Sequence, residues 1–165
     1  MFVRQNFQNK NLWQESLKEH IAFKPLETTV TSDIAIIGAG YTGCSAALFA
    51  VNNGLSVTLI DQKIGYGGSG RNVGLVNAGL WLPPEKVENI LGVDAGSTLN
   101  KALAKTPDLV FDLIDKYDIK CSANRSGTLH CAHSQNGLKD IQKRYQQLST
   151  RGAELDLLDK QQTNQ

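Results

Sequence analysis

The turn GAGYTG at residues 38–43 constrains the fold most, because it lies between a run of β-branched residues and a stretch with helical spacing. The run before it, DIAIIG at residues 33–38, predicts a strand buried on both faces. Residues 41–53 place small and apolar side chains at helical intervals and end at Asn53-Gly54, which predicts a helix and its stop. LSVTLID at residues 55–61 predicts a second buried strand. Strand, helix and strand in about 30 residues make a βαβ unit, so we expect an α/β fold with parallel strands.

The glycine spacing in this turn is that of a dinucleotide-binding loop. Gly38, Gly40 and Gly43 form GxGxxG between the predicted strand and helix. In such loops the first glycine allows the tight turn, the second lets the backbone approach a pyrophosphate, and the third permits close packing of helix against strand. The N–H groups of residues 41–43 would then face the phosphates at the positive end of the helix dipole.

An acidic residue completes the dinucleotide-binding pattern. Asp61 follows Gly43 by 18 residues, at the end of the second predicted strand. A carboxylate at about this distance accepts hydrogen bonds from the adenosine ribose. Its charge would repel a 2′-phosphate, so the sequence disfavours NADP. A Rossmann-like FAD or NAD site is the prediction.

Composition limits the class of protein and its partners. The 165 residues are 41% hydrophobic and 20% charged, as in a soluble globular protein. A net charge of +1 and the lack of a basic stripe argue against nucleic acid as a partner. Because no apolar run approaches a signal peptide's core or a membrane span, we expect no membrane partner and a cytoplasmic location. The three cysteines, spaced far apart, predict reduced, mostly buried thiols and no metal site.

The rest of the chain predicts an arm, helices and one hairpin. The arm, residues 1–30, carries a short amphipathic helix at 11–22. Residues 119–134 change to a period of two around Asn124–Gly127, which predicts a hairpin, and LDLL near the end predicts a short strand. Further helices are expected at residues 84–92, 97–117 with a kink or break at Pro107, and 137–150.

This organisation predicts three regions. Residues 1–30 form the arm and 31–117 the N-terminal part of a nucleotide-binding domain. Residues 118–165 are a further, incomplete region, which the family resemblance given below implies is the start of a mixed α+β substrate domain. A sheet of two strands leaves an edge and much of both faces uncovered. We therefore expect a fragment, whose partner is the missing C-terminal part of the same protein.

A second glycine-rich loop, residues 62–80, distinguishes among nucleotides. It is a poor helix or strand but can lie against a large planar ligand. Here the sequence resembles the FAD-dependent amine and amino-acid oxidoreductases of the D-amino-acid oxidase superfamily, in particular their γ-glutamylputrescine oxidase-like branch. SGRN after a dinucleotide fingerprint is the most specific feature, and the resemblance runs from about residue 11 to 159. The matching features are Leu12-Trp13, DIAIIGAGYTGCSAAL, Asp61, SGRNVGLVNAG, TPDLVFDLIDKYDI and SGTLH.

The resemblance implies FAD as cofactor, with residues 69–72 close to the flavin. Arg71 would supply a positive charge, and Ser69 and Asn72 hydrogen bonds. Val73 departs from the family, which usually has a second glycine there, and Asp61 stands where glutamate is commoner. The predicted cofactor-binding residues are Gly38, Gly40, Tyr41, Thr42, Gly43, Asp61, Gln62, Ser69, Gly70, Arg71 and Asn72.

The resemblance also implies oxidation of the C–N bond of an amine or amino acid. A hydride would pass to the flavin, the imine would hydrolyse, and oxygen would reoxidise the cofactor, which carries the chemistry. Family members are more than twice this length, so we name no catalytic residue.

Tyr66 and Trp81 are candidates to flank the ring system or the substrate entrance, or simply pack. We interpret His130, Cys131 and His133 as hairpin residues rather than metal ligands, because neighbours on a strand face opposite sides.

Two other interpretations stay open. Asp61 permits an NAD-dependent dehydrogenase fragment, although SGRN argues against it. The chain could also be a non-catalytic nucleotide-binding or interaction module, whose loops survive without activity.

Overall fold

The computed structural model describes residues 11–18 and 22–164. The chain divides into two compact units, Met1–Leu75 (the first unit) and Val76–Gln165 (the second unit). The helix expected at residues 11–22 lies partly outside the described residues, and so does the arm at 1–30. The domain boundaries expected at residues 30 and 117 stay predictions.

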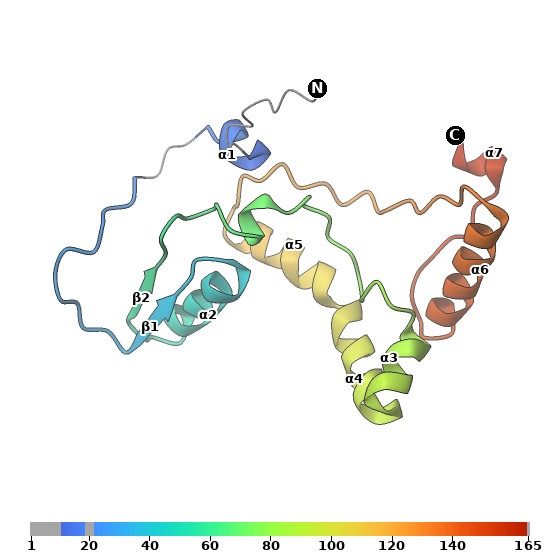
Figure 1. Ribbon diagram of the computed structural model, residues 1–165, viewed down its shortest axis with the longest axis horizontal. Helices are drawn as coiled ribbons and strands as arrows, with labels where there is room; N and C mark the ends of the chain where they lie inside the picture. The colour runs from blue at the N-terminus through green and yellow to red at the C-terminus, as the bar shows by residue number, and fades with distance from the viewer. Residues whose placement is uncertain (1–10, 19–21, 165) are drawn as a thin grey trace, which may run out of the picture. The chain divides into compact units, whose positions relative to one another are not determined.

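The first unit contains the predicted βαβ arrangement. Strand β1 (Ile34–Ile37) leads into helix α2 (Tyr41–Asn52), which returns to strand β2 (Val57–Ile60). The two strands are parallel, and they pair from Ile34 with Val57 to Ile37 with Ile60. Helix α2 packs against both strands (Figure 1). The expected α/β fold with parallel strands is therefore confirmed.

A carboxylate fastens the amino ends of the two strands. Asp33, just before β1, accepts hydrogen bonds from the Ser56 N–H at 2.8 Å and the Ser56 hydroxyl at 2.6 Å. The Asp33 N–H lies 2.9 Å from the same hydroxyl oxygen. The Ser56 hydroxyl, and after it the Ser56 N–H, hold the pKa of the Asp33 carboxyl below its ordinary value of 3.8. These bonds fix the strand register at the end of the sheet opposite the glycine turn.

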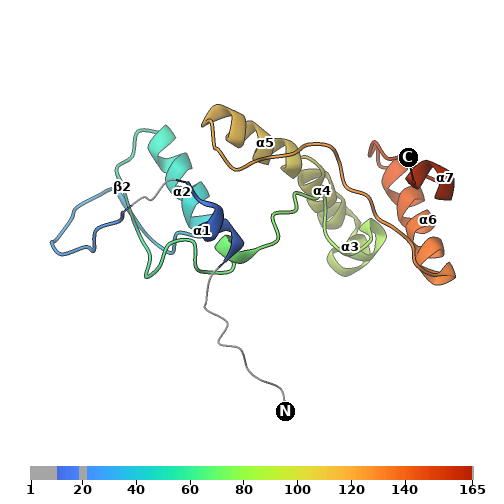
Figure 2. The ribbon, with the colours of Figure 1, turned by 90° about the horizontal axis from the view of Figure 1, so that it is seen from above.

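Two short helices complete the first unit. Helix α1 (Leu12–Ser16) begins at Asn11, whose side chain accepts a hydrogen bond from the Gln14 N–H. The 3₁₀ helix η1 (Ser69–Arg71) is formed by the second glycine-rich loop. Helix α1 contacts η1, and the two lie side by side in Figures 1 and 2.

The second unit is helical in the described residues. The predicted break near Pro107 is confirmed, because α4 ends at Ala104 and Pro107 is the second residue of α5. Helix α7 was not predicted, although its capping box, Asp159 with Gln162, is visible in the sequence. The helices are α3 (Pro84–Leu91), α4 (Val93–Ala104), α5 (Thr106–Lys116), α6 (Gln135–Ser149) and α7 (Lys160–Thr163).

Close backbone contact and one ion pair organise α3, α4 and α6. A Cβ at buried Gly96 would lie 2.5 Å from the Glu88 Cα, so α4 meets α3 where only glycine fits. Arg151, just after α6, donates to both carboxylate oxygens of Glu88, at 2.8 and 3.2 Å. Asn100 donates to the same carboxylate at 3.3 Å. The Arg151 guanidinium lowers the pKa of Glu88, which therefore stays charged at neutral pH.

The hairpin predicted at residues 119–134 is wrong, and so is the strand LDLL. Neither segment contains a strand in the described structure, and residues 119–133 reach α6 without forming a helix or strand. Ser122, inside the expected first arm of the hairpin, has a φ of +53°, which interrupts an extended strand. A lone hairpin is also marginally stable without further strands.

Two burial predictions are also wrong. The strands are not buried on both faces, since Ile37 is 86% exposed and Ile34 is 36% exposed. The three cysteines are free, but all of them are exposed rather than buried. The strands and Cys44 of α2 are exposed because the described part of the chain packs few elements against them. Cys121 and Cys131 are exposed in the segment 119–133, which forms no helix or strand.

We expect replacement of Asp33 by alanine to lower the temperature of thermal unfolding in a pH-dependent way. The folded pKa of Asp33 lies below the unfolded one, so its stabilisation is present above about pH 4 and is lost as pH falls through the folded pKa. The difference in melting temperature between wild type and D33A should be full at pH 7 and smaller at an acidic pH below about 4. Ser56→Ala should reproduce part of the loss. An equal difference at both pH values would contradict the role of the charge.

Candidate cofactor site

The glycine turn brings α2 directly onto the end of β1. Gly38 has a φ of +105°, a conformation that favours glycine, and its N–H donates to the Ile60 carbonyl at 2.8 Å. A Cβ at Gly43 would lie only 1.9 Å from the Gly38 carbonyl oxygen. Two of the three glycines are therefore required by geometry: one by its backbone angle and the other by the close approach of helix to turn.

The first turn of α2 offers backbone donors to a ligand. The first hydrogen bond of the helix runs from the Cys44 N–H to the Gly40 carbonyl at 2.9 Å. The N–H groups of Thr42 and Gly43 precede it and so have no acceptor within the helix. They border an open hollow of about 390 Å³, lined by Ile36, Ile37, Gly38, Gly40, Tyr41, Thr42, Gly43, Ala46 and Ser69.

Asp61 ties the end of β2 to the glycine turn. One of its carboxylate oxygens accepts from the Ala39 N–H at 2.7 Å, and the other accepts from the Lys63 N–H at 2.7 Å. The Ala39 N–H, and after it the Lys63 N–H, hold the pKa of Asp61 below its ordinary value of 3.8. Each oxygen keeps a second lone pair, so the charged carboxylate can still accept from a ribose hydroxyl.

The second glycine-rich loop folds back on itself. A Cβ at Gly70 would lie 2.0 Å from the Gly65 carbonyl oxygen, so the chain can close here only with glycine. In contrast, a Cβ at Gly67 or Gly68 would meet no atom within 4 Å. The contact at Gly70 brings η1 back to the start of the loop. The residues of η1 therefore have a defined place beside the glycine turn.

Hydrogen bonds join this loop to the N-terminus of α2. The Ser69 hydroxyl accepts from the Tyr41 N–H at 3.1 Å, and a Cβ at Gly40 would come within 3.1 Å of the same oxygen. The Asn72 amide donates to the Tyr41 hydroxyl at 2.6 Å and to the Ser69 carbonyl. Its oxygen accepts from the Gly74 N–H at 2.6 Å. The loop and the first turn of α2 thus form one connected structure.

A basic and aromatic cluster lies at the outer side of the loop. The Lys63 ammonium lies 4.2 Å from the centre of the Tyr66 ring, and the Arg71 guanidinium carbon lies 5.0 Å from it. Both distances suit cation–π attraction. Tyr66 thereby holds two positive charges next to a small hollow of about 80 Å³. That hollow is lined by Ala39, Gly40, Asp61, Lys63, Gly65, Gly67, Gly68, Ser69 and Gly70.

Most of the predicted cofactor-binding residues come together around these two hollows. Arg71 and Gln62 line neither of them, since Arg71 stacks on Tyr66 and Gln62 is exposed. Asn72 contributes through Tyr41 rather than by lining a hollow.

The sequence interpretation missed three residues of the site. Ala39 binds the Asp61 carboxylate through its backbone, which no sequence pattern specifies. Lys63 could have been noticed as one of two basic residues flanking an aromatic residue in a glycine-rich loop. Trp13 of α1 donates its indole N–H to the Asn72 carbonyl at 2.8 Å. Its only sequence signal was the Leu12-Trp13 pair in the arm.

The chemistry of the donors fits the diphosphate and ribose of a dinucleotide. Glycines leave room for the backbone to approach, Thr42 and Gly43 line the larger hollow with N–H groups that have no acceptor within the helix, and a carboxylate stands at the end of β2. These features suit the adenosine diphosphate part that FAD and NAD have in common. The second glycine-rich loop is an element beyond the strand, turn and helix that bind this part.

The candidates in the second unit do not form such a site. The rings of Trp81 and His130 meet edge to face, with centres 6.3 Å apart. Within residues 11–18 and 22–164, no three His, Cys, Asp or Glu side chains are grouped so that they could hold a metal ion. No helix in the same residues has the length and hydropathy to cross a membrane.

Comparison with known proteins gives one family. The family model described as FAD dependent oxidoreductase (DAO) matches residues 33–165. The chain is 28% identical to gamma-glutamylputrescine oxidoreductase of Escherichia coli over 87% of its own length and 34% of the relative's. It is 29% identical to the probable oxidoreductase OrdL of Haemophilus influenzae over 68% of its own length and 26% of the relative's. The chain thus spans about a third or less of these relatives, and no solved structure matches it.

We expect Gly70→Ala to abolish FAD binding and Gly67→Ala to leave it nearly unchanged. The two glycines share one loop, and neither has a positive φ. Only the methyl group at residue 70 would collide with backbone, at the Gly65 carbonyl. Titration of each variant with FAD, followed by the quenching of flavin fluorescence, measures the difference. Equal affinities would show that the fold of this loop is irrelevant to binding.

We expect Asp61→Ala to weaken FAD binding by about ten- to a hundredfold, because hydrogen bonds to a charged acceptor are stronger than those between neutral groups. The lowered pKa keeps Asp61 charged from pH 5 to 8. Ionisation of Asp61 should therefore cause no change in the wild-type affinity for FAD across that pH range. The matched control is Asp33→Ala, which removes a carboxylate with similar bonds at the opposite end of the sheet. Equal loss of affinity in the two variants would assign the effect to folding alone.

Proposed function

Because this chain belongs to the family of FAD dependent oxidoreductases, whose model matches residues 33–165, we propose that its first unit binds FAD at the two glycine-rich loops. We further propose that the site serves oxidation of the C–N bond of an amine or amino acid. In this proposal β1, α2 and β2 are a Rossmann-like unit. All eleven predicted cofactor-binding residues lie in the first unit.

The contact between the two loops carries the proposal. The Ser69 hydroxyl occupies the Tyr41 N–H at the start of α2, and its own proton is left to donate to another acceptor. The N–H groups of Thr42 and Gly43 would hold the diphosphate, and Asp61 would hold the adenosine ribose. A site for NAD needs only the glycine turn and the carboxylate. A second loop fastened to that turn supports the larger dinucleotide.

Each side chain of the loop has a proposed task. Ser69 and Asn72 would orient the cofactor beside α2, because both are already fixed to Tyr41. Arg71 and Lys63, both stacked on Tyr66, would supply positive charge near the phosphates. Lys63 also lines the smaller hollow, whereas Arg71 lines neither. Bound FAD would supply the hydride acceptor. The residues of this chain bind and orient it.

The name of one relative supports the substrate class. Gamma-glutamylputrescine oxidoreductase is, by its name, an enzyme that acts on an amine. In the corresponding reaction the substrate carbon loses a hydride, the attached nitrogen loses a proton, and water hydrolyses the resulting imine. We propose molecular oxygen as the final electron acceptor. We leave the catalytic residues unassigned, because the residues placed around the two hollows orient a cofactor.

The test begins with the visible absorption spectrum of the 165-residue chain mixed with FAD, before and after denaturation. We expect a flavin spectrum that is shifted by the folded protein and reverts on unfolding. NAD should not displace the flavin. A folded chain that binds NAD and not FAD would favour the dehydrogenase interpretation. A folded chain that binds neither would contradict the proposal that the two loops form a dinucleotide-binding site.

A second measurement addresses the substrate. A chain loaded with FAD is mixed without oxygen with γ-glutamylputrescine, putrescine or single amino acids. We expect an amine to bleach the flavin absorption, and oxygen to restore it with release of hydrogen peroxide. Retained FAD that no amine bleaches would leave the cofactor assignment standing and overturn the proposed reaction for this chain.

A further inference from the structure

We propose that α1 is a clasp that holds the second loop in place for the cofactor, with Trp13 as its positioning residue. The proposal rests on the proposed FAD site, because it concerns how the loop of that site keeps its shape. Trp13 lies 25 residues before Gly38, the first glycine of the fingerprint, and lines neither hollow.

Helix α1 and its N-cap residue contact the second loop at two points, before and after η1. At one end, the Asn11 side-chain amide donates to the Gly65 carbonyl at 3.1 Å. At the other end, the Trp13 indole N–H donates to the Asn72 carbonyl at 2.8 Å. Asn11 also caps α1 by accepting from the Gln14 N–H at 2.8 Å, so one side chain both starts the helix and binds the loop.

The indole ring also packs on the loop. A Cβ at Gly74 would lie 2.9 Å from the six-membered ring of Trp13, so the ring lies directly over the Gly74 backbone. Gly74 has a φ of +77°, and its N–H is bonded to the Asn72 side chain. The contact therefore covers the turn by which the loop leaves η1. Ring and N–H together fix residues 72–74 from the side away from α2.

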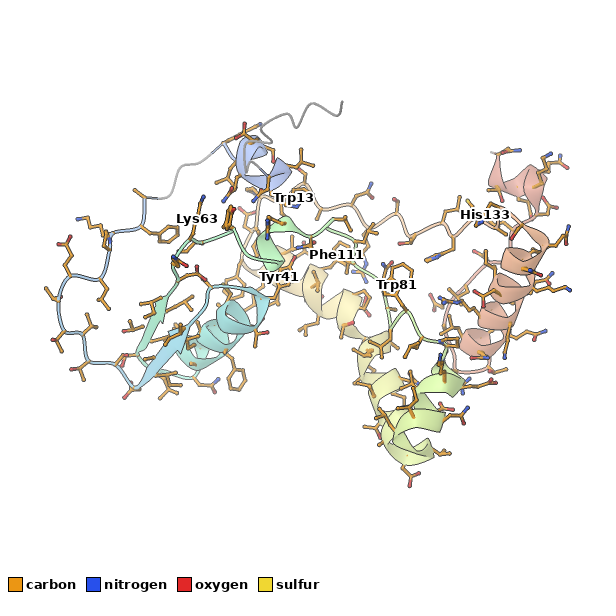
Figure 3. All side chains as sticks on the ribbon, in the orientation of Figure 1. Trp13, Tyr41, Lys63, Trp81, Phe111 and His133 are labelled. Atoms are coloured by element: carbon orange, nitrogen blue, oxygen red, sulfur yellow. The ribbon has the colours of Figure 1, made fainter. Side chains whose placement is uncertain are left out.

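Those residues connect directly to the phosphate-binding end of α2. The Asn72 carbonyl is held by Trp13, while the Asn72 side chain is held by the Tyr41 hydroxyl. Figure 3 labels Trp13 and Tyr41 on either side of η1. Helix α1 has five residues, too few to be stable alone in water, so it depends on the loop as the loop depends on it. Loss of the indole should thus release the loop without unfolding the sheet.

Variants at Trp13 separate positioning from folding. Trp13→Ala removes both the ring and the hydrogen bond, and Trp13→Phe keeps most of the ring contact. The matched control is Leu12→Ala, which changes the neighbouring residue on the same helix, 71% exposed. We expect the Kd for FAD to rise about tenfold in W13A, about threefold in W13F, and less than twofold in L12A.

Hydrogen exchange of the chain without FAD provides the second readout. Amides of residues 65–75 should exchange faster in W13A than in wild type or L12A, while those of β1 and β2 should not change. Unchanged exchange in residues 65–75 of W13A would overturn the clasp. Faster exchange with an unchanged Kd would overturn its role in cofactor binding. If wild type binds no FAD, the proposed function fails, and the exchange comparison still decides the clasp.

Discussion

The first unit depends on the close approach of α2 to the turn that precedes it. A Cβ at Gly43 would sit 1.9 Å from the Gly38 carbonyl oxygen, far inside any allowed contact, so the helix can begin here only with glycine at that position. This approach directs the first N–H groups of α2 along the carboxyl edge of the strands, where ligands of open α/β sheets bind. Asp61 reaches the same turn from the next strand through the Ala39 N–H.

The second glycine-rich loop also depends on a close backbone contact that only glycine permits. At Gly70, as at Gly43, the backbone passes too near a carbonyl oxygen for any side chain. The closed loop then places Ser69 and Asn72 against Tyr41, so that residues separated by about 30 positions share one surface. Glycines with space around them, such as Gly67, contribute nothing comparable. Which glycine matters is decided by what a methyl group would meet, and composition alone does not reveal it.

The sequence predicted those parts whose cause is local. The glycine turn and the break before Pro107 follow from residues within a few positions of one another, and the βαβ unit follows from three continuous runs that are each read locally. All three are present. The hairpin at residues 119–134 failed because its expected first arm contains Ser122 with a positive φ, and nothing in the residue type announces that angle. Burial of Ile37 and of the cysteines failed because burial depends on what packs nearby. Trp13 was missed as a site residue because its partner, Asn72, lies 59 positions away.

The groups of the site determine which part of a bound molecule it can recognise. Its contacts to a ligand would be mostly backbone N–H groups, a carboxylate and a serine hydroxyl, all of which recognise the common part of a dinucleotide. Such groups select the class of cofactor that binds, and they do not distinguish one substrate from another. Choice of substrate requires side chains that contact the reacting atoms, and the residues that line the two hollows are the ones we propose for the cofactor. The residues around the two hollows therefore favour a dinucleotide cofactor, whereas an amine substrate is supported by the name of a relative of which the aligned part of this chain covers 34%.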